Sequence, residues 1–233
     1  MKAFLPAPMI SSRKLANAGF AAARALSTGY NDKPASASRP FDAGRDGFVM
    51  GEGAGILVIE SLHHALHRGA PPLAELVGYG TSADAYHLTA GPEDGSGAAR
   101  AMLAALRQAD IEPSLVRHLN AHATSTPVGD RSEIAAIKSI FGPKPGLAIS
   151  ATKSATGHML GAAGGVEAIF TIKALHDRVV PPTLNLIDPD PLATGLNIVG
   201  PTARPWDFQY AISNGFGFGG VNASVLFRRW DGR

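Results

Sequence analysis

Hydrophobic positions along the second part of the chain follow two periods that alternate. Apolar residues at helical spacing predict helices, which we expect over residues 97–110, from 130 or 131 to 141, and over 159–175. Short apolar runs predict strands, one ending at residue 121 and others over 147–150, 210–213 and 221–227. Helices and strands that alternate in this way, and end in a pair of strands, predict α/β layering.

The first part of the chain is less regular. It predicts a short helix over 18–26, a long loop over 27–53 and a buried strand over 53–60. A helix over 61–68, stopped by Gly69, and a strand over 73–80 complete the pattern. Because a loop as long as 27–53 is unusual inside a compact domain, we expect it to be functional or disordered.

Composition then excludes several classes of protein. The 233 residues are 45% hydrophobic and 17% charged, as in an ordinary globular protein, and the net charge of +2 gives no global field that favours nucleic acid. No apolar stretch approaches the roughly 18 residues that a membrane span needs. The start of the chain lacks the pattern of a secretory signal, so we expect a cytoplasmic protein.

The chain contains no cysteine. This single observation removes disulfides, thiolate metal sites and every cysteine nucleophile from the chemistry that these residues can perform. No spacing of histidine, aspartate and glutamate matches a metal site either, so we predict that no metal is bound.

The first string with candidate chemistry is NAHATSTP, residues 120–127. A strand runs directly into a polar turn there, and the carboxyl ends of strands are where open α/β sheets hold ligands. The His122 imidazole could donate to a developing oxyanion, and Thr124 and Thr126 could bind a ligand that bears amides. The alternative is a buried histidine bound to backbone, with the hydroxyl residues serving as a helix cap.

The second string is SATKSATGHM, residues 150–159, followed by the small residues GAAGG. Small residues allow a helix to pack closely against its neighbours, which predicts that its N-terminus lies deep in the protein. The helix dipole disfavours an imidazolium at that end, so a neutral His158 would suit an electrophilic role. The alternative is a surface Lys153 and a capping His158.

Two glycine-rich strings remain. NGFGFGGVN, residues 214–222, opens into a strand rather than a helix and so fails the context of a dinucleotide-binding motif. A plain hairpin turn is the alternative, although it does not explain two phenylalanines in an exposed turn. RPFDAGRDGFVMGEG, residues 39–53, indicates by itself only a structured loop.

In chain order these four strings resemble the type II β-ketoacyl-acyl-carrier-protein synthases of fatty-acid synthesis, and the similarity extends from about residue 18 to residue 227. The resemblance implies a thiolase-like α/β fold with a mixed five-stranded sheet packed by helices in each half. Here the fold would be incomplete. Residues 1–70 would be a remnant of the N-terminal half, and residues 71–233 the C-terminal half.

The resemblance also implies an activity: an acyltransferase that decarboxylates malonyl carrier protein and joins it to an acyl thioester. His122 and His158 match the two histidines that hold the thioester oxygen as it becomes an enolate. Lys153 matches the lysine that organises the site electrostatically, with Glu167 as its expected partner.

The remaining matches concern the substrates. Thr124 and Thr126 correspond to threonines that bind the phosphopantetheine arm, which belongs to the acyl carrier protein, so no cofactor of the chain's own is implied. Phe218 corresponds to the gating phenylalanine beside the acyl pocket, and Arg24 to a basic contact with the carrier protein.

In this family a cysteine upstream of these motifs takes the acyl chain, and the sequence has none. We therefore expect a synthase chain that is truncated, split or wrongly started, working as a homodimer or with a companion chain that supplies the other half. One alternative is a non-catalytic partner like the chain-length factors, and another is a free-standing malonyl-carrier-protein decarboxylase. An isolated half would expose an apolar interface and should be poorly stable.

Overall fold

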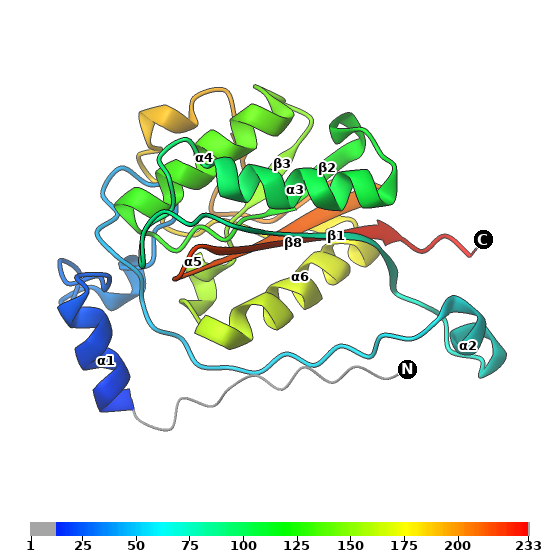
Figure 1. The fold of residues 1–233 in the computed structure, drawn as a ribbon, viewed down its shortest axis with the longest axis horizontal. Helices are drawn as coiled ribbons and strands as arrows, with labels where there is room; N and C mark the ends of the chain where they lie inside the picture. The colour runs from blue at the N-terminus through cyan, green and yellow to red at the C-terminus, as the bar shows by residue number, and fades with distance from the viewer. Residues whose placement is uncertain (1–12, 233) are drawn as a thin grey trace.

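A six-stranded mixed sheet forms the centre of the computed structural model, which describes residues 13–232 (Figure 1). Its order is β1-β8-β7-β2-β3-β5. The strands are β1 (Ala74–Ala83), β2 (Val116–Asn120), β3 (Ala148–Ser150), β5 (Asn197–Ile198), β7 (Tyr210–Gly217) and β8 (Val221–Arg229). Strands β7, β2, β3 and β5 are mutually parallel, whereas β8 is antiparallel to both β7 and β1. A separate two-stranded sheet pairs β4 (Val179–Val180) with β6 (Arg204–Pro205).

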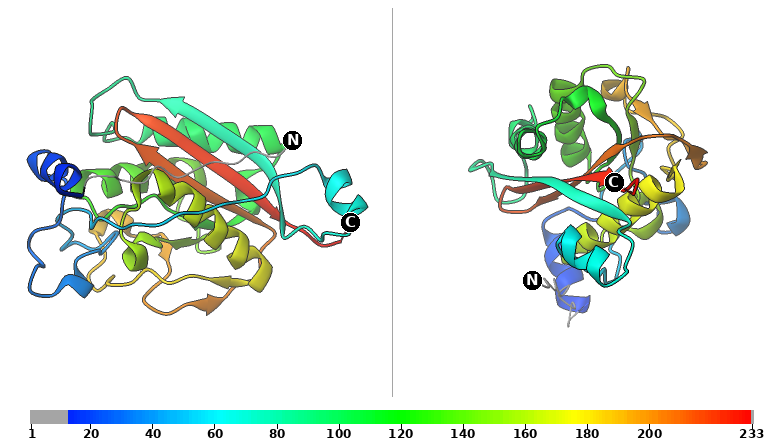
Figure 2. Two further views of the ribbon diagram at one scale, coloured as in Figure 1. Left: turned by 90° about the horizontal axis from the view of Figure 1, so that it is seen from below. Right: turned by 90° about the vertical axis from the view of Figure 1, so that its right-hand side faces the viewer.

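Helices cover both faces of the sheet (Figures 1 and 2). The α-helices are α1 (Arg13–Ala22), α2 (Leu62–His67), α3 (Ser96–Ala109), α4 (Pro127–Phe141), α5 (Lys153–Thr156) and α6 (Ala163–Asp177). Short 3-10 turns span Pro34–Ser36, Pro113–Leu115, Leu160–Ala162 and Pro191–Ala193. Helices α3 and α4 lie on one face and α6 on the other, so the predicted α/β layering is confirmed.

The alternation of side chains along the strands explains this arrangement. Leu119 faces Ile149 on β3 and Ile212 on β7, and this row continues to Leu226 on β8. The row belongs to the core cluster under α3 and α4, whereas the alternate positions belong to the cluster under α6. Because successive residues of a strand point to opposite faces, short apolar runs bury both sides of the sheet at once.

Most of the predicted elements of the second part are confirmed within a few residues, and so are the helix at α2 and the strand at β1. The resemblance implies a five-stranded mixed sheet, and the described sheet is mixed with six strands. The pattern of the sequence did not indicate β5, which is only two residues long. The predicted helix over 18–26 lies earlier, as α1. After α1 the chain leaves the helix, and Leu26 pairs with Phe48 in an isolated parallel bridge.

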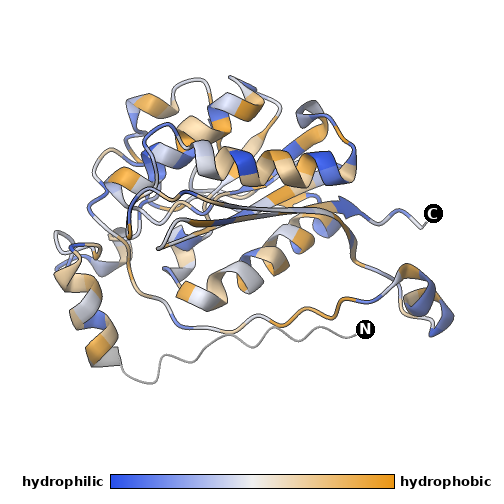
Figure 3. Ribbon diagram, in the orientation of Figure 1, coloured by the Kyte–Doolittle hydropathy of each residue, from blue (hydrophilic) through white to orange (hydrophobic). Residues whose placement is uncertain are grey.

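The predicted buried strand over 53–60 is wrong for the described structure. The segment is extended, but it belongs to no sheet, and Ile56 and Val58 are 64% and 67% exposed. Figure 3 shows its apolar stretch on the chain that runs past α6. Its pattern is that of a strand, but none of the described residues pairs with it, because the sheet ends at β1 and β5.

The described residues 13–232 include no helix with the length and apolarity that crossing a bilayer requires.

Two close approaches between backbones depend on glycine. A Cβ at Gly80 of β1 would lie 2.1 Å from the carbonyl oxygen of Ala101 in α3. A Cβ at Gly165 of α6 would lie 3.0 Å from the carbonyl oxygen of Gly55, so the extended segment passes directly over the small residues of this helix. Close packing is therefore confirmed at Gly165, but Gly161 and Gly164 are exposed, so the predicted deep position of this helix start is confirmed only in part.

We predict that Gly80→Ala lowers the free energy of unfolding by about 1–3 kcal/mol, because α3 must move away from β1 to admit the methyl group. Urea denaturation measures the change. Gly200→Ala is the matched control, since a Cβ at Gly200 meets no atom within 4 Å. Equal stability of the two variants would contradict the packing described for α3.

Candidate active site

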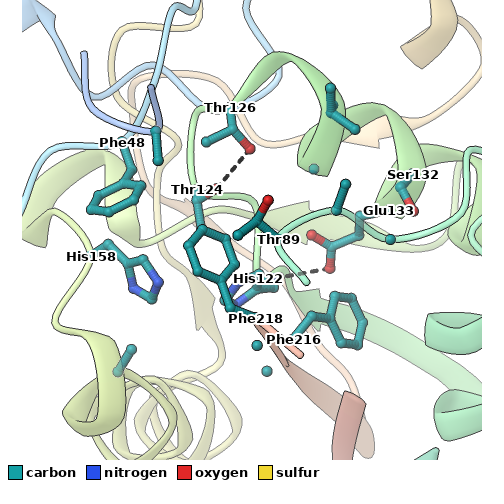
Figure 4. A pocket seen from close by; sticks show the side chains of 18 of the residues that line it. Phe48, Thr89, His122, Thr124, Thr126, Ser132, Glu133, His158, Phe216 and Phe218 are labelled. Atoms are coloured by element: carbon teal, nitrogen blue, oxygen red, sulfur yellow. Dashed lines mark hydrogen bonds between the residues drawn. The ribbon is translucent and has the colours of Figure 1, made fainter. Parts of the chain in front are cut away.

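The polar turns that follow β2 and β3 meet at one edge of the sheet. His122 lies two residues beyond the end of β2, and Lys153 begins α5 just after β3. Because β2 and β3 are adjacent and parallel, their carboxyl ends deliver both turns to the same place. A cavity of about 780 Å3 opens there, and both His122 and His158 line it (Figure 4).

The two imidazoles lie side by side in this cavity. Their ring centroids are 5.4 Å apart and their planes are nearly perpendicular, at 85°. The backbone N–H of Leu160 donates to Nδ1 of His158 at 3.3 Å, so that nitrogen carries no proton in the neutral ring and Nε2 is the donor. The backbone of His158 is itself fixed, since its N–H donates to Val49 and its carbonyl accepts from Gly51.

Both imidazoles are held in the neutral form. Burial lowers the pKa of His122 well below its ordinary value, and the nearby Lys153 ammonium and His158 lower it further. Burial, and then Lys153, lower the pKa of His158 to about 3. Removing water disfavours the charged ring, and a neighbouring cation adds repulsion. At neutral pH the cavity therefore presents two uncharged rings.

Lys153 forms a buried ion pair with Glu167 of α6. The two residues are 1% and 2% exposed. Burial raises the pKa of Glu167 to about 6, although the ammonium opposes this rise. Glu167 lines the cavity whereas Lys153 does not, so the ammonium reaches the imidazoles through its field from behind the cavity wall.

The other predicted site residues also line the cavity. Thr124 and Thr126 place their hydroxyl oxygens 3.0 Å apart, as Figure 4 shows. Phe218 is 50% exposed in the turn between β7 and β8, and Arg24 is exposed just after α1. The structure thus gathers every predicted substrate-facing residue around one space. The roles assigned to them remain predictions.

Several other lining residues were not singled out from the sequence, among them Phe48, Phe216 and Glu133, which contact the two histidines. Phe48 packs its ring 5.2 Å from that of His158, and Phe216 packs 5.5 Å from His122. Both lie in strings that had been singled out for their glycines. The carboxylate of Glu133 accepts from the backbone N–H of His122 at 2.9 Å, and no local pattern distinguishes this residue from other helical glutamates.

The string 39–53, which alone indicated only a structured loop, holds the turn after β2 in place. The guanidinium of Arg45 donates to the carbonyls of Thr126 and Pro127 and pairs with Asp190 at 2.8 Å. The N–H of Gly47 donates to the carbonyl of Ser125. Ser125 has a φ of 71°, so these bonds, together with Asp130, maintain a strained turn beside His122.

Among residues 13–232 no group of three or more metal-ligating side chains is assembled.

Comparison with known proteins identifies matching families. Residues 73–187 match the model described as β-ketoacyl synthase, C-terminal domain, and residues 9–65 match the N-terminal domain of the same synthase. The chain is 54% identical over 221 residues to 3-oxoacyl-[acyl-carrier-protein] synthase 2 of Vibrio harveyi, covering 94% of the chain and 53% of that protein. It is 54% identical to the mitochondrial 3-oxoacyl-[acyl-carrier-protein] synthase of Arabidopsis thaliana, covering 91% and 47%. The chain thus spans about half the length of the curated relatives that it matches.

Solved structures give the same result. A β-ketoacyl synthase from Burkholderia phymatum STM815 superposes with a TM-score of 0.91 at 42% identity, over 99% of this chain and 54% of the other. A type II polyketide ketosynthase in complex with its acyl-carrier protein gives a TM-score of 0.90 at 38% identity, over 93% and 53%. These likenesses confirm the thiolase-like fold, over about half of each neighbour.

We predict that Lys153→Met lowers the free energy of unfolding by about 3–5 kcal/mol near pH 8, because it leaves a buried carboxylate without its partner. The matched control is Lys173→Met, which breaks the exposed pair with Asp177 and should cost about 0–1 kcal/mol. Chemical denaturation of both variants provides the comparison. Equal losses would mean that Lys153 is not the buried cation described above.

A second prediction concerns protonation. The ring nitrogen shifts of His122 and His158 in NMR spectra should stay those of neutral imidazole from about pH 8 to about pH 5, since burial and Lys153 lower both pKa values. In the urea-unfolded chain, the matched control, the same rings should titrate near the ordinary value of 6.5.

The sign of the stability effect follows from the same shift. Between about pH 6.5 and about pH 3, His158 is protonated in the unfolded chain but stays neutral in the folded chain. The contribution of this residue to stability is therefore complete above about pH 6.5 and is lost as the pH falls toward 3. A folded-state midpoint near 6.5 for either ring would contradict the assignment of two neutral donors.

Proposed function

The chain belongs to the β-ketoacyl synthase family, and from that premise we propose that it acts in fatty-acid elongation, as part of a 3-oxoacyl-acyl-carrier-protein synthase. The reaction is the decarboxylative condensation of malonyl carrier protein with an acyl thioester, an acyl transfer. The observation that carries this proposal is the pair of neutral imidazoles, 5.4 Å apart, in one cavity.

The imidazoles suit the first chemical step. When the bond between the carboxylate carbon and the α-carbon of the malonyl group breaks, carbon dioxide leaves and the electron pair passes to the α-carbon and the thioester oxygen. His122 and His158 would donate hydrogen bonds to that oxygen as it becomes negative. A preorganised donor of this kind contributes about 2.7–4 kcal/mol to stabilising the transition state.

The buried ammonium supports the same step. Together with burial, which is the larger cause, Lys153 lowers the pKa values of both rings, and its positive charge favours an enolate that forms beside them. Glu167 compensates the ammonium in the resting state, so the site need not bury an isolated charge before substrate arrives. In this proposal Lys153 acts by its charge and does not contact the reacting atoms.

The rest of the cavity would hold the substrate. The Thr124 and Thr126 hydroxyls are suited to the amides of a phosphopantetheine arm, and Phe218 to gating the acyl pocket. We propose Arg24 as a contact for the acidic carrier protein, because it is exposed and lines the cavity. One structural neighbour is a ketosynthase in complex with an acyl-carrier protein, which supports this choice of partner.

The second step needs a group that these 233 residues do not contain. The carbanion must attack an acyl thioester carbon and expel a thiolate, and the sequence has no cysteine. We propose that the thiol belongs to the other half of a complete synthase, which a companion chain could supply. The assembled synthase would be a homodimer or a pair with that companion chain, and it would work in the cytoplasm. Residues 1–70 would belong to the N-terminal half and residues 71–233 to the C-terminal half.

The absent cysteine also keeps a second candidate open, a non-catalytic partner like the chain-length factors. Two structural neighbours are ketosynthases paired with such a factor. A silent partner has no need of two neutral imidazoles beside a buried ammonium. The presence of His122 and His158 in one cavity, with the Lys153–Glu167 ion pair in and behind its wall, favours the catalytic proposal.

We predict that the purified chain, shown to be folded by circular dichroism, releases radiolabelled carbon dioxide from malonyl carrier protein. His122→Ala or His158→Ala should reduce kcat by about 10²–10³-fold, because each removes one donor to the enolate oxygen. His176→Ala is the matched control, since that histidine is half exposed near the end of α6 and pairs with Asp177. A folded chain that releases no carbon dioxide would contradict the donor roles proposed for His122 and His158.

A further inference from the structure

The backbone at His122 is held by a single buried carboxylate. Glu133 of α4 accepts from the N–H of His122 at 2.9 Å with one oxygen and from the N–H of Ala123 at 2.7 Å with the other. Figure 4 shows the carboxylate beside His122 in the cavity wall. Glu133 is 2% exposed, so water does not compete for these bonds. Two successive amides bound to one rigid group fix the direction in which the His122 side chain leaves the backbone.

Glu133 is in turn fixed from the sheet. The side-chain amide of Asn214 on β7 donates to Glu133 at 3.0 Å, and the Ser224 hydroxyl on β8 donates to the carbonyl oxygen of that amide at 2.8 Å. A carboxylate only accepts, so Asn214 must turn its NH2 toward Glu133 and its oxygen toward Ser224. Asn214 and Ser224 are each 1% exposed and face one another across the β7–β8 ladder.

Strand β7 also contacts His122 directly. Phe216 lies two residues after Asn214 and therefore on the same face of β7, and its ring centroid is 5.5 Å from that of His122. One contact holds the backbone of His122 through Glu133, and the other holds the ring directly. The position of the imidazole thus depends on how β7 is seated against β8.

We propose that Ser224, Asn214 and Glu133 form a hydrogen-bond relay that positions the His122 imidazole, with Ser224 as its remote end. The inference rests on the proposed function, because positioning matters only if His122 stabilises an enolate. None of the three residues needs to touch the reacting atoms. A small displacement of a catalytic group can lower the reaction rate strongly. A relay that fixes the His122 imidazole would therefore affect the rate even though it lies outside the reacting atoms.

Ser224→Ala tests the relay at its remote end, where the side chain removed is small. Loss of the hydroxyl frees the Asn214 amide to rotate, so kcat for decarboxylation of malonyl carrier protein should fall about fivefold, the factor that one modest hydrogen bond represents. KM should stay within about twofold, since substrate contacts are unchanged. Ser224→Thr, which keeps the hydroxyl, should restore the rate.

The matched control is Ser82→Ala. Ser82 lies on the neighbouring strand β1, where its hydroxyl donates to the carbonyl of Gly97 at 2.6 Å, outside the relay. Like Ser224→Ala, the Ser82→Ala variant loses one hydroxyl group and the hydrogen bond that this hydroxyl donates. An equal fall in kcat for Ser82→Ala and Ser224→Ala would overturn the proposal, because the effect would then reflect general loosening of the sheet.

Amide hydrogen exchange gives a readout that does not depend on activity. In Ser224→Ala the amides of His122 and Ala123 should exchange about fivefold faster than in the wild type, whereas in Ser82→Ala they should not. If the wild-type chain releases no carbon dioxide, the proposed function fails and this measurement still decides the relay. Unchanged exchange of both amides in Ser224→Ala would refute the relay even in an active enzyme.

Discussion

A buried ammonium paired with a buried carboxylate determines how this site can work. Lys153 would be costly to bury alone, and Glu167 makes its burial possible by supplying the opposite charge from α6. Burial first, and then the Lys153 charge, lower the pKa values of His122 and His158, so both rings stay neutral and each keeps an N–H to donate. At the start of α6, Gly165 lets the helix approach Gly55 of the extended segment closely.

The geometry of the imidazoles depends on contacts between segments that are far apart in the sequence. His158 is held by Val49 and Gly51, and the turn that follows His122 is held by Arg45 and Gly47. One loop therefore clamps both histidine turns from the same side, while β7 approaches His122 from the other through Asn214 and Phe216. These contacts explain why residues 37–48 are mostly buried, although the stretch is rich in glycine and charge and forms no helix or strand.

The sequence predicted the elements of the second part because their apolar periods are long enough to be read, and it placed His122, Lys153 and His158 after strand ends that prove to be neighbours. It could not predict Glu133, because nothing about a glutamate on α4 reveals that its carboxylate will meet two amides from the preceding turn. Phe48 and Phe216 lay within strings that glycine had marked, but only the packed structure gives their rings a purpose. The apolar pattern of the sequence therefore predicts the helices and strands, whereas the orientation of the site residues depends on tertiary contacts.

In the segment 53–60 the strand predicted from the sequence pattern is not present in the described structure. Its apolar run is typical of a strand buried on both faces, yet Ile56 and Val58 are exposed, and its backbone pairs with no strand of residues 13–232. The segment lies within the part that matches the N-terminal domain of the synthase, and the matched relatives are about twice as long as this chain. The pattern of this segment is typical of a strand, but a strand also needs a neighbour to pair with, and none of the described residues supplies one.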